Sequence, residues 1–424
     1  MIVKLDYGRD DVAVDLRGLR VRPLQPSAPR GVGDLGRLLS RAVDYPVEGP
    51  NLSELARERR SAVIVVPDAT RRVCLPEVLP VIVNRLLAAA VPADAITILV
   101  ACGTHPQVVK SEIAELVGKV PLGVTVRQHD SRSDDHLVTV GELRPGRALR
   151  IDAEAAAADL LVTVGGVMHH YFAGFGGGPK MIFPGIAGYD EIQANHALVF
   201  RQGAQGVERH PSCEPGVLEG NPVAEEISRA ADLNPPHFAV CLVPGRLGGI
   251  AWASGGPWRT AFAAAVEKVV EWYGVVGAGF DHLVGCGGGR PGDSTLIQAH
   301  KRLDAICRFA NPGAEVLFVA KLGDGVGSSV MEPFLADPRP EAILDRLARR
   351  YVQYGHTTLR IVEKTARYRV HLKSALDPEI AERLGFIPVI DLDEIADRWR
   401  SKGARDRVAV MSEAPVWPRV RDTS

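Results

Sequence analysis

The residues best placed to do chemistry fall between positions 169 and 188, where three consecutive glycines are flanked by histidines and a lysine. Glycines let backbone N–H groups approach an anion closely, and a helix N-terminus after them would favour a phosphate. The segment matches neither the Walker A pattern nor GxGxxG. A turn that needs positive φ at several positions is the structural alternative, but it does not explain the flanking side chains. We therefore interpret the segment as a cofactor-holding loop, carried by His169, His170, Gly176, Gly177, Gly178 and Lys180.

A further imidazole, His196, follows in a segment expected to be helical from about Tyr189. An imidazole that converges on an anion-binding loop suggests a metal ligand. An incidental histidine on the helix surface is the alternative. No second His, Cys or carboxylate stands near His196 at ligand spacing, so most remaining ligands of a metal would have to come from a cofactor.

A polar segment, PDATR at residues 67–71, follows the expected strand 62–66. Asp68, Thr70 and Arg71 offer a carboxylate, a hydroxyl and a fixed positive charge, which could hold the anionic part of a ligand. Asp68 and Thr70 could equally cap the helix expected from Leu75. The residues alone leave both interpretations open.

The next expected strand, residues 98–100, leads into ACGTHP and so places His105 at the same edge of a sheet. Ligands of open α/β sheets bind outside the carboxyl ends of the strands. His105 could therefore be a general acid or base. A lone loop histidine is more often a solvated or capping residue, and the position beside Asp68 is what favours catalysis.

Short β-branched runs alternate with segments of helical periodicity, which indicates an α/β fold with largely parallel sheets. The expected strands are residues 62–66, 98–100, 160–164, 239–243, 282–284 and 316–320, and the expected helices are residues 75–90, 107–118, 259–273, 295–309 and 341–351.

The chain of 424 residues exceeds the roughly 250 to 300 that one hydrophobic core organises, so two α/β domains are expected. We expect a cofactor-binding domain at residues 1–272, a second domain at 273–395, and a tail at 396–424 that returns to the first domain. The active site is expected in a cleft between the domains.

The bulk composition excludes several classes of protein. The net charge of −1 leaves no basic stripe for nucleic acid. No apolar run approaches the roughly 18 residues of a membrane span, and the six cysteines form no CxxC pair. The start of the chain alternates apolar and polar residues like a strand, unlike a signal peptide. These features predict a cytoplasmic protein, and they leave the oligomeric state open.

In the second domain, VGCGGGRPGD at residues 284–293 precedes a helix that carries Gln298 and Lys301. The two side chains could close over a substrate carboxylate. The alternative is an ordinary glycine-rich turn capped by Asp293 or Ser294, with Lys301 on a solvated helix face.

Taken together, the PDATR, GTHP, HxxAGFGGGPKxxxPG and ANHA segments resemble the nickel-pincer-nucleotide enzymes of the lactate racemase family. The order and spacing of these segments match over most of the first domain. The resemblance implies a pyridinium-3-thioamide-5-thiocarboxylic acid mononucleotide that holds nickel through two sulfurs and a ring carbon. It implies that His196 completes the nickel coordination and that Lys180 occupies the place of a lysine that can be linked to the nucleotide.

The same resemblance implies that His105 and His170 act as acid and base on opposite faces of a small 2-hydroxy acid, while the C2 hydrogen moves as a hydride. The remaining matches are assigned as follows: Asp68, Thr70, Gly176, Gly177 and Gly178 to the cofactor, and Arg71, Gln298 and Lys301 to the substrate. Partners would be the substrate and the enzymes that make the cofactor, with neither nucleic acid nor membrane.

Two departures from the family pattern bear on the substrate. The family loop commonly has serine where this chain has Gly176, and a late tryptophan has no counterpart near residues 351–356. We therefore weigh three alternatives to a racemase of a lactate-like substrate. They are an epimerase of a longer sugar acid, a non-catalytic nickel-nucleotide carrier, and a nicotinamide dehydrogenase, which the missing GxGxxG disfavours.

Overall fold

The computed structural model describes residues 1–71, 73–204, 206–277, 279–401 and 407–419. The chain divides into two compact units. Unit 1 comprises Met1–Ser27, Gln202–Glu208 and Trp272–Ser424, and unit 2 comprises Ala28–Arg201 and Arg209–Glu271.

Unit 2 is built on a six-stranded sheet in the order β15-β14-β9-β4-β5-β6, parallel except between β14 and β15. Its strands are β4 Ala62–Pro67, β5 Ile96–Ala101, β6 Thr125–Gln128, β9 Leu160–Gly166, β14 Phe238–Pro244 and β15 Ile250–Gly256. The central strand β4, with the sequence AVIVVP, is buried along its whole length. This continuous β-branched run is what a strand covered on both faces requires.

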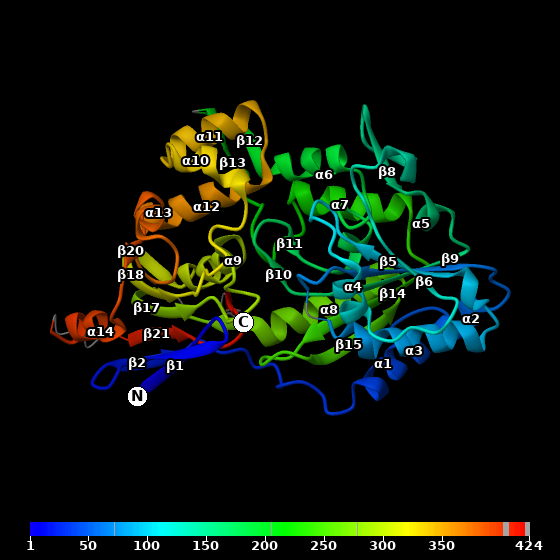
Figure 1. Ribbon diagram of the computed structural model, residues 1–424, viewed down its shortest axis with the longest axis horizontal. Helices are drawn as coiled ribbons and strands as arrows, with labels where there is room; N and C mark the ends of the chain where they lie inside the picture. Colours follow the sequence, from blue (N-terminus) through cyan, green and yellow to red (C-terminus); the bar gives the residue numbers. More distant parts are fainter. Residues whose placement is uncertain (72, 205, 278, 402–406, 420–424) are drawn as a thin grey trace, which may run out of the picture. The chain divides into compact units, whose positions relative to one another are not determined.

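Helices cover both faces of this sheet, with α1 and α3 side by side along one face and α7 on the other (Figure 1). The helices are α1 Leu35–Asp44, α2 Leu52–Ala56, α3 Leu75–Ala88, α4 Lys110–Val117, α5 Ala153–Ala157, α6 Tyr189–His196, α7 Pro222–Leu233 and α8 Trp258–Tyr273. Smaller strands are β7 Leu137–Arg144, β8 Arg147–Asp152, β10 His169–His170 and β11 Gly174–Phe175. The paired strands β12 Phe200–Gly203 and β13 Gly206–Arg209 fall mostly within Gln202–Glu208, which belongs to unit 1. The apolar side chains of β4, β5 and β9 and the buried face of α3 form one core.

Unit 1 has a second six-stranded sheet, in the order β20-β19-β18-β17-β21-β3, in which every pair is parallel. Its strands are β3 Arg20–Pro23, β17 Phe280–Cys286, β18 Ala310–Val319, β19 Arg369–Lys373, β20 Ile387–Pro388 and β21 Arg407–Met411. Its helices are α9 Leu296–Cys307, α10 Glu332–Leu335, α11 Pro340–Arg349, α12 Gln353–Arg367, α13 Pro378–Arg383 and α14 Leu392–Ser401. A hairpin of β1 Ile2–Tyr7 and β2 Asp10–Asp15 and a pair of β16 Gly274–Val276 and β22 Trp417–Arg419 complete the unit.

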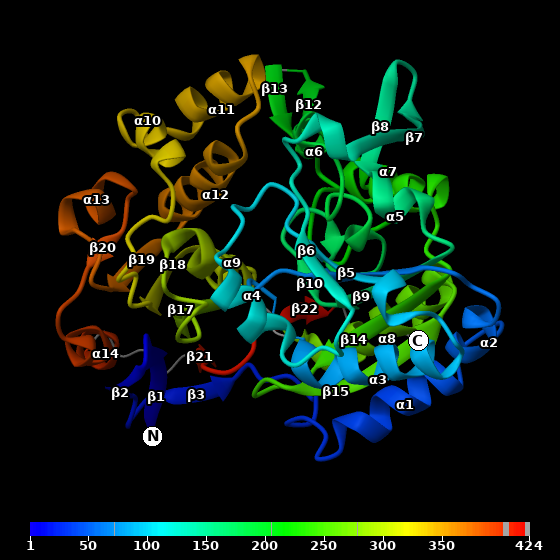
Figure 2. The ribbon, with the colours of Figure 1, turned by 45° about the vertical axis from the view of Figure 1, so that its right-hand side comes forward.

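The α/β class with largely parallel sheets is confirmed, but the units differ from the expected domain boundaries. Residues 1–27 belong with the second domain, because the hairpin packs its apolar face against α14 and the sheet of β17 and β18 (Figure 2). The tail returns to this same sheet, where β21 lies between β17 and β3. Residues 402–406 and 420–424 of the tail lie outside the described residues.

Candidate active site

The predicted site residues follow the ends of three neighbouring strands of unit 2 and so start at one edge of the sheet. β4 lies between β5 and β9 and runs parallel to both. Pro67 at the end of β4 pairs with Ala101 at the end of β5, so Asp68 and the loop that carries His105 start side by side. β9 ends at Gly166, shortly before His170. The register of the sheet therefore assembles residues that are distant in sequence.

Asp68 and His105 form a direct contact, with His105 Nδ1 2.5 Å from Asp68 Oδ2. The other carboxylate oxygen, Oδ1, accepts from the Thr70 backbone N–H at 3.1 Å and from its hydroxyl at 2.6 Å. Arg71 in turn donates to Thr70 Oγ1 at 3.1 Å. The chain Arg71, Thr70, Asp68 and His105 thus forms one connected polar network.

The alternative role of Asp68 and Thr70 as caps of the next helix is not found. Helix α3 begins after Cys74, whose φ is 53°, and no side chain caps it. Instead, the carboxylate of Asp68 is committed to Thr70 and His105. Capping of α3 therefore does not account for the side chains of this segment.

Burial acts to raise the pKa of Asp68, but hydrogen bonding to His105 and the charges of His105 and Arg71 outweigh it and lower the pKa to about 2. Asp68 is only 15% exposed, so solvent screens these interactions little. The carboxyl group is therefore ionised at neutral pH and serves only as a hydrogen-bond acceptor.

The lowered pKa of Asp68 predicts a pH-dependent contribution to stability. The unfolded chain, with a value of 3.8, takes up the proton before the folded chain does. The stabilisation is therefore complete above about pH 4 and is lost as pH falls towards 2. One pKa unit corresponds to about 1.4 kcal/mol, which gives roughly 2 kcal/mol in all. Urea titrations should show the stability advantage of the wild type over Asp68→Asn shrinking by about 1 to 2 kcal/mol between about pH 5 and pH 2.5. A constant advantage would contradict the assignment.

The ring of Phe172 brings three predicted residues together. Its centroid lies 4.7 Å from the ring of His170 and 5.2 Å from that of His196, both in edge-on geometry. The Lys180 ammonium lies 5.7 Å from the same centroid. The acid/base, tether and metal-ligand candidates therefore surround one aromatic side chain.

His196 ends helix α6 and is buried, with 7% of its surface exposed. Burial first, and then the nearby charges of Lys180 and His105, lower its pKa to about 3. The ring is thus neutral at pH 7, the form that binds metals. A hydrogen bond with the Ile192 backbone acts in the opposite direction on the pKa but does not outweigh burial. A neutral buried imidazole fits a metal ligand better than an incidental surface histidine.

His169 and His170 point in opposite directions because they are consecutive residues of strand β10. The His169 ring packs on Phe175 at 4.9 Å, whereas His170 packs on Phe172 and Tyr171. The pleat of one short strand therefore explains why only one of the pair joins the cluster around Phe172.

The glycine loop is shaped by close packing as well as by backbone freedom. A Cβ on Gly177 would lie 2.6 Å from Gly166 O, and Gly177 has φ +70°. A Cβ on Gly178 would strike the ring of Phe262. The expected helix after the glycines is only a 3-10 turn, Gly178–Met181, so its dipole is small. The N–H groups of Gly176 and Lys180 already donate within the protein, to Met168 O at 2.7 Å and Gly177 O at 3.0 Å.

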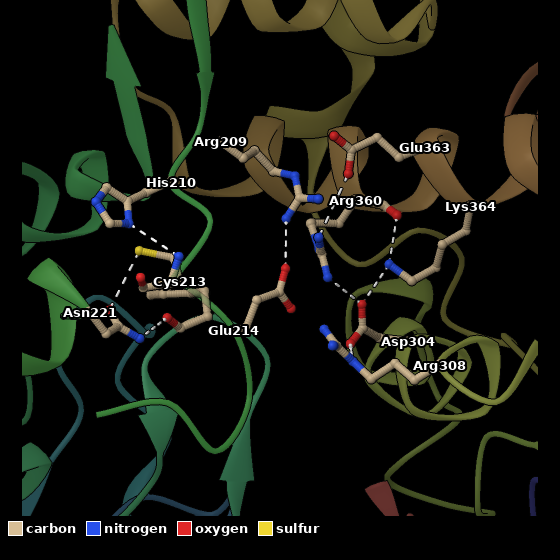
Figure 3. A network of polar contacts seen from close by, with 12 residues as sticks. Arg209, His210, Cys213, Glu214, Asn221, Asp304, Arg308, Arg360, Glu363 and Lys364 are labelled. Atoms are coloured by element: carbon tan, nitrogen blue, oxygen red, sulfur yellow. Dashed lines mark hydrogen bonds and ion pairs between the residues drawn. The ribbon is translucent and has the colours of Figure 1, made fainter. Parts of the chain in front are cut away.

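A residue that the sequence did not single out, Asn221, holds the backbone of this cluster. Its side-chain amide donates to Phe172 O at 2.9 Å, and its Oδ1 accepts from the N–H groups of Val223 and Ala224 at the start of α7. Figure 3 shows Asn221 beside Cys213, whose thiol also contacts Oδ1. Asn followed by Pro222 is a recognisable helix start, but its partner Phe172 is 49 positions away.

Gln298 and Lys301 lie one turn apart on α9 of unit 1, where the Lys301 ammonium donates to Gln298 Oε1 at 2.8 Å. The expected capping by Asp293 is not found, since its Oδ2 accepts from the N–H groups of Gly8 and Lys321 at 2.7 and 3.0 Å. The structure thus brings Gln298 and Lys301 together as a pair.

Helix α9 is anchored by a buried carboxylate, Asp304. It accepts hydrogen bonds from Arg360 at 2.6 Å and Arg308 at 2.9 Å and pairs with Lys364 at 2.6 Å (Figure 3). These charges hold the pKa of Asp304 well below its usual range despite burial. The network joins α9 to α12 and fixes the helix that carries Gln298 and Lys301.

In the parts of the chain that the structure describes, no three His, Cys, Asp or Glu side chains are grouped to hold a metal ion. Within the same parts, no helix combines the length and apolarity needed to cross a bilayer.

Comparison with known proteins gives consistent matches. The lactate racemase N-terminal domain family matches residues 7–207. A lactate racemase of Lactiplantibacillus plantarum is 31% identical over 73% of this chain and 71% of its own length. One of Thermoanaerobacterium thermosaccharolyticum is 28% identical over 82% of this chain and 81% of its own.

Solved structures agree with the sequence matches. The lactate racemase apoprotein of Thermoanaerobacterium thermosaccharolyticum is similar with a TM-score of 0.87 and 25% identity, over 99% of this chain and 100% of that one. A crystal structure of a Thermotoga maritima protein shares the fold, with a TM-score of 0.65 and 14% identity over 87% of this chain and 96% of that one. The chain therefore belongs to the lactate racemase family, whose named members are isomerases.

Proposed function

We propose that this protein inverts the C2 centre of a small, lactate-like 2-hydroxy acid, using a nickel-pincer nucleotide. The observation that carries the proposal is the gathering of His170, Lys180 and His196 around Phe172, with the Asp68–His105 pair within electrostatic reach of His196. The lactate racemases among the relatives support the substrate class.

The residues present fit such a cofactor. His196 supplies a buried neutral imidazole, the form of histidine that binds nickel. The glycine loop is held in one conformation because Gly177 packs on Gly166 and Gly178 on Phe262, and we propose that this fixed loop lies beside the nucleotide. Lys180 emerges from this loop and would be the residue that tethers the nucleotide. When bound, the nucleotide supplies a pyridinium ring that can accept and return a hydride.

The hydroxyl proton is the part of the reaction that the protein must manage itself. Removing the C2 hydrogen as a proton would leave a carbanion beside an ionised carboxylate, whereas hydride chemistry requires only that the hydroxyl be deprotonated as the ketone forms. Imidazoles suit this transfer at neutral pH. We assign it to His105, in the loop after β5, and to His170, on the short strand β10 that follows β9.

The carboxylate of the substrate needs a cation that stays charged. Arg71 provides one beside the Asp68–His105 pair, and its guanidinium is fixed by Thr70. Lys301 and Gln298, already paired on α9, are proposed to contact the substrate as well. The enzymes that make the nucleotide would be the partners that activate the protein.

A panel of hydroxy acids tests this proposal. The protein is expressed with the cofactor-making enzymes, and (S)- and (R)-lactate and longer 2-hydroxy acids are followed by chiral chromatography. We expect each lactate enantiomer to approach an equal mixture, and faster than any longer acid. Preference for longer acids would instead identify an epimerase of sugar acids. No turnover of any acid by protein shown to contain nickel would indicate a carrier and refute the proposed function.

A further inference from the structure

The two histidines assigned to proton transfer have different partners on their Nδ1 atoms. His105 Nδ1 faces Asp68 Oδ2 at 2.5 Å. Because Asp68 is ionised, it can only accept, so His105 Nδ1 must carry a hydrogen. In the neutral ring the lone pair then resides on Nε2. Asp68 thus selects the tautomer in which His105 presents a base.

His170 is held the opposite way. The backbone N–H of Ala173 donates to His170 Nδ1 at 3.2 Å. A backbone N–H can only donate, so this nitrogen must hold the lone pair, and the neutral ring carries its hydrogen on Nε2. Packing of the ring against Tyr171 and Phe172, with centroids at 5.0 and 4.7 Å, holds this orientation.

We propose that Asp68 and the Ala173 amide hold the two histidines in opposite tautomers, so that His105 is the base of the resting enzyme and His170 a hydrogen-bond donor. This inference rests on the proposed function for its catalytic meaning. As the hydroxyl O–H bond breaks, the proton forms a bond with the lone pair of His105 Nε2, and its electron pair stays on the substrate oxygen. The resulting imidazolium faces Asp68 and gives the proton back to the substrate oxygen as the C2–H bond forms again. Asp68 is therefore a positioning residue that acts through His105.

Replacing Asp68 by asparagine should invert the tautomer of His105. The asparagine oxygen is expected to keep the two hydrogen bonds from Thr70, as Oδ1 does now. The amide nitrogen then replaces Oδ2 and donates to His105 Nδ1. A neutral ring that accepts a hydrogen bond on Nδ1 must carry its hydrogen on Nε2. In the wild type, Nε2 instead holds the lone pair that acts as the base. The substitution preserves shape and changes only which nitrogen carries the proton.

Two-bond ¹H–¹⁵N correlation spectra of the full-length protein without cofactor test the tautomers directly, because bare and protonated ring nitrogens resonate far apart. Signals are assigned by their loss in His105→Gln and His170→Gln, at a pH where both rings are neutral. In the wild type we expect the hydrogen on Nδ1 of His105 and on Nε2 of His170. In Asp68→Asn we expect the hydrogen of His105 on Nε2. The exposed Asp135→Asn is the matched control and should leave both rings unchanged. The proposal would be overturned if His105 and His170 had the same tautomer in the wild type. It would also be overturned if His105 kept its tautomer in Asp68→Asn.

A second measurement tests the positioning role in the loaded enzyme. The same Asp-to-Asn change in a catalytic Asp–His pair costs about 10⁴ in kcat by imposing the wrong tautomer. We expect Asp68→Asn to lower the kcat of racemisation by about 10³ to 10⁴ relative to Asp135→Asn. A loss below tenfold would show that Asp68 does not position the base. If the wild type itself racemises nothing, the proposed function fails while the spectra still decide the tautomers.

Discussion

His105→Ala is expected to lower the kcat of lactate racemisation by about 10² to 10⁴, the usual contribution of a positioned acid or base. The variant removes the imidazole that Asp68 orients and leaves His170, Lys180 and His196 in place around Phe172. Because these residues remain, the nickel content of the loaded protein should be close to that of the wild type. The measurement is the rate of racemisation per nickel bound.

Another histidine of unit 2 serves as the control for this variant. His136 is exposed and ends a short 3-10 turn, Asp134–His136. His136→Ala should keep full activity. If His105→Ala also keeps full activity per nickel, His105 has no part in the transfer of the hydroxyl proton.

Gly177→Ala is expected to destabilise the protein by about 2 to 6 kcal/mol. The backbone of Gly177, with φ +70° and ψ −161°, lies in a region that costs a non-glycine residue roughly 1 to 3 kcal/mol, and overpacking a close contact adds about 1 to 3 kcal/mol. The new Cβ would lie 2.6 Å from Gly166 O and 2.9 Å from Gly166 C, and a backbone at the end of β9 cannot move aside easily. Denaturant unfolding of the protein without cofactor measures the loss.

The neighbouring glycine provides a matched comparison. A Cβ on Gly176 would lie 3.7 Å from Met168 O, an ordinary contact, and Gly176 is not among the glycines with positive φ. Gly176→Ala should change stability by less than about 1 kcal/mol, in either direction. Equal effects of the two substitutions would show that the loop does not have the described backbone.

The sequence was most informative where local pattern decides structure. The run at 62–66 predicted β4, the periodicity at 75–90 predicted α3, and both formed with ends shifted by two residues or fewer. Similar patterns located β9 and α9. The apolar side chains that bury these elements follow the period of a strand or a helix. Their composition and spacing therefore specify the elements without knowledge of the rest of the chain.

Partnerships across the fold could not be predicted in this way. The contact of Asp68 with His105 depends on the register of β4 against β5, and sequence alone left Asp68 as a possible helix cap. The place of β21 between β17 and β3 joins the two ends of the described chain. Strand propensity shows that a strand exists, but not which edge of which sheet it joins.

The cluster around Phe172 shows the same limit at the site. His170, Lys180 and His196 were singled out by residue type, because imidazole and ammonium groups carry chemistry. Phe172, which gathers them, looked like an ordinary apolar residue, and Asn221, which binds its backbone, lies in another segment. Side chains that organise a site through packing carry no chemical signature in sequence.

The central claim, inversion by hydride transfer, is tested most directly by the fate of the C2 hydrogen. Single-enantiomer lactate carrying deuterium at C2 is racemised in ordinary water by the nickel-loaded enzyme, and the inverted product is analysed by mass spectrometry. The account predicts that the inverted lactate retains deuterium at C2, because the hydride returns to the carbon it left. Hydrogen from solvent at C2 of the inverted product would contradict it and indicate proton abstraction instead.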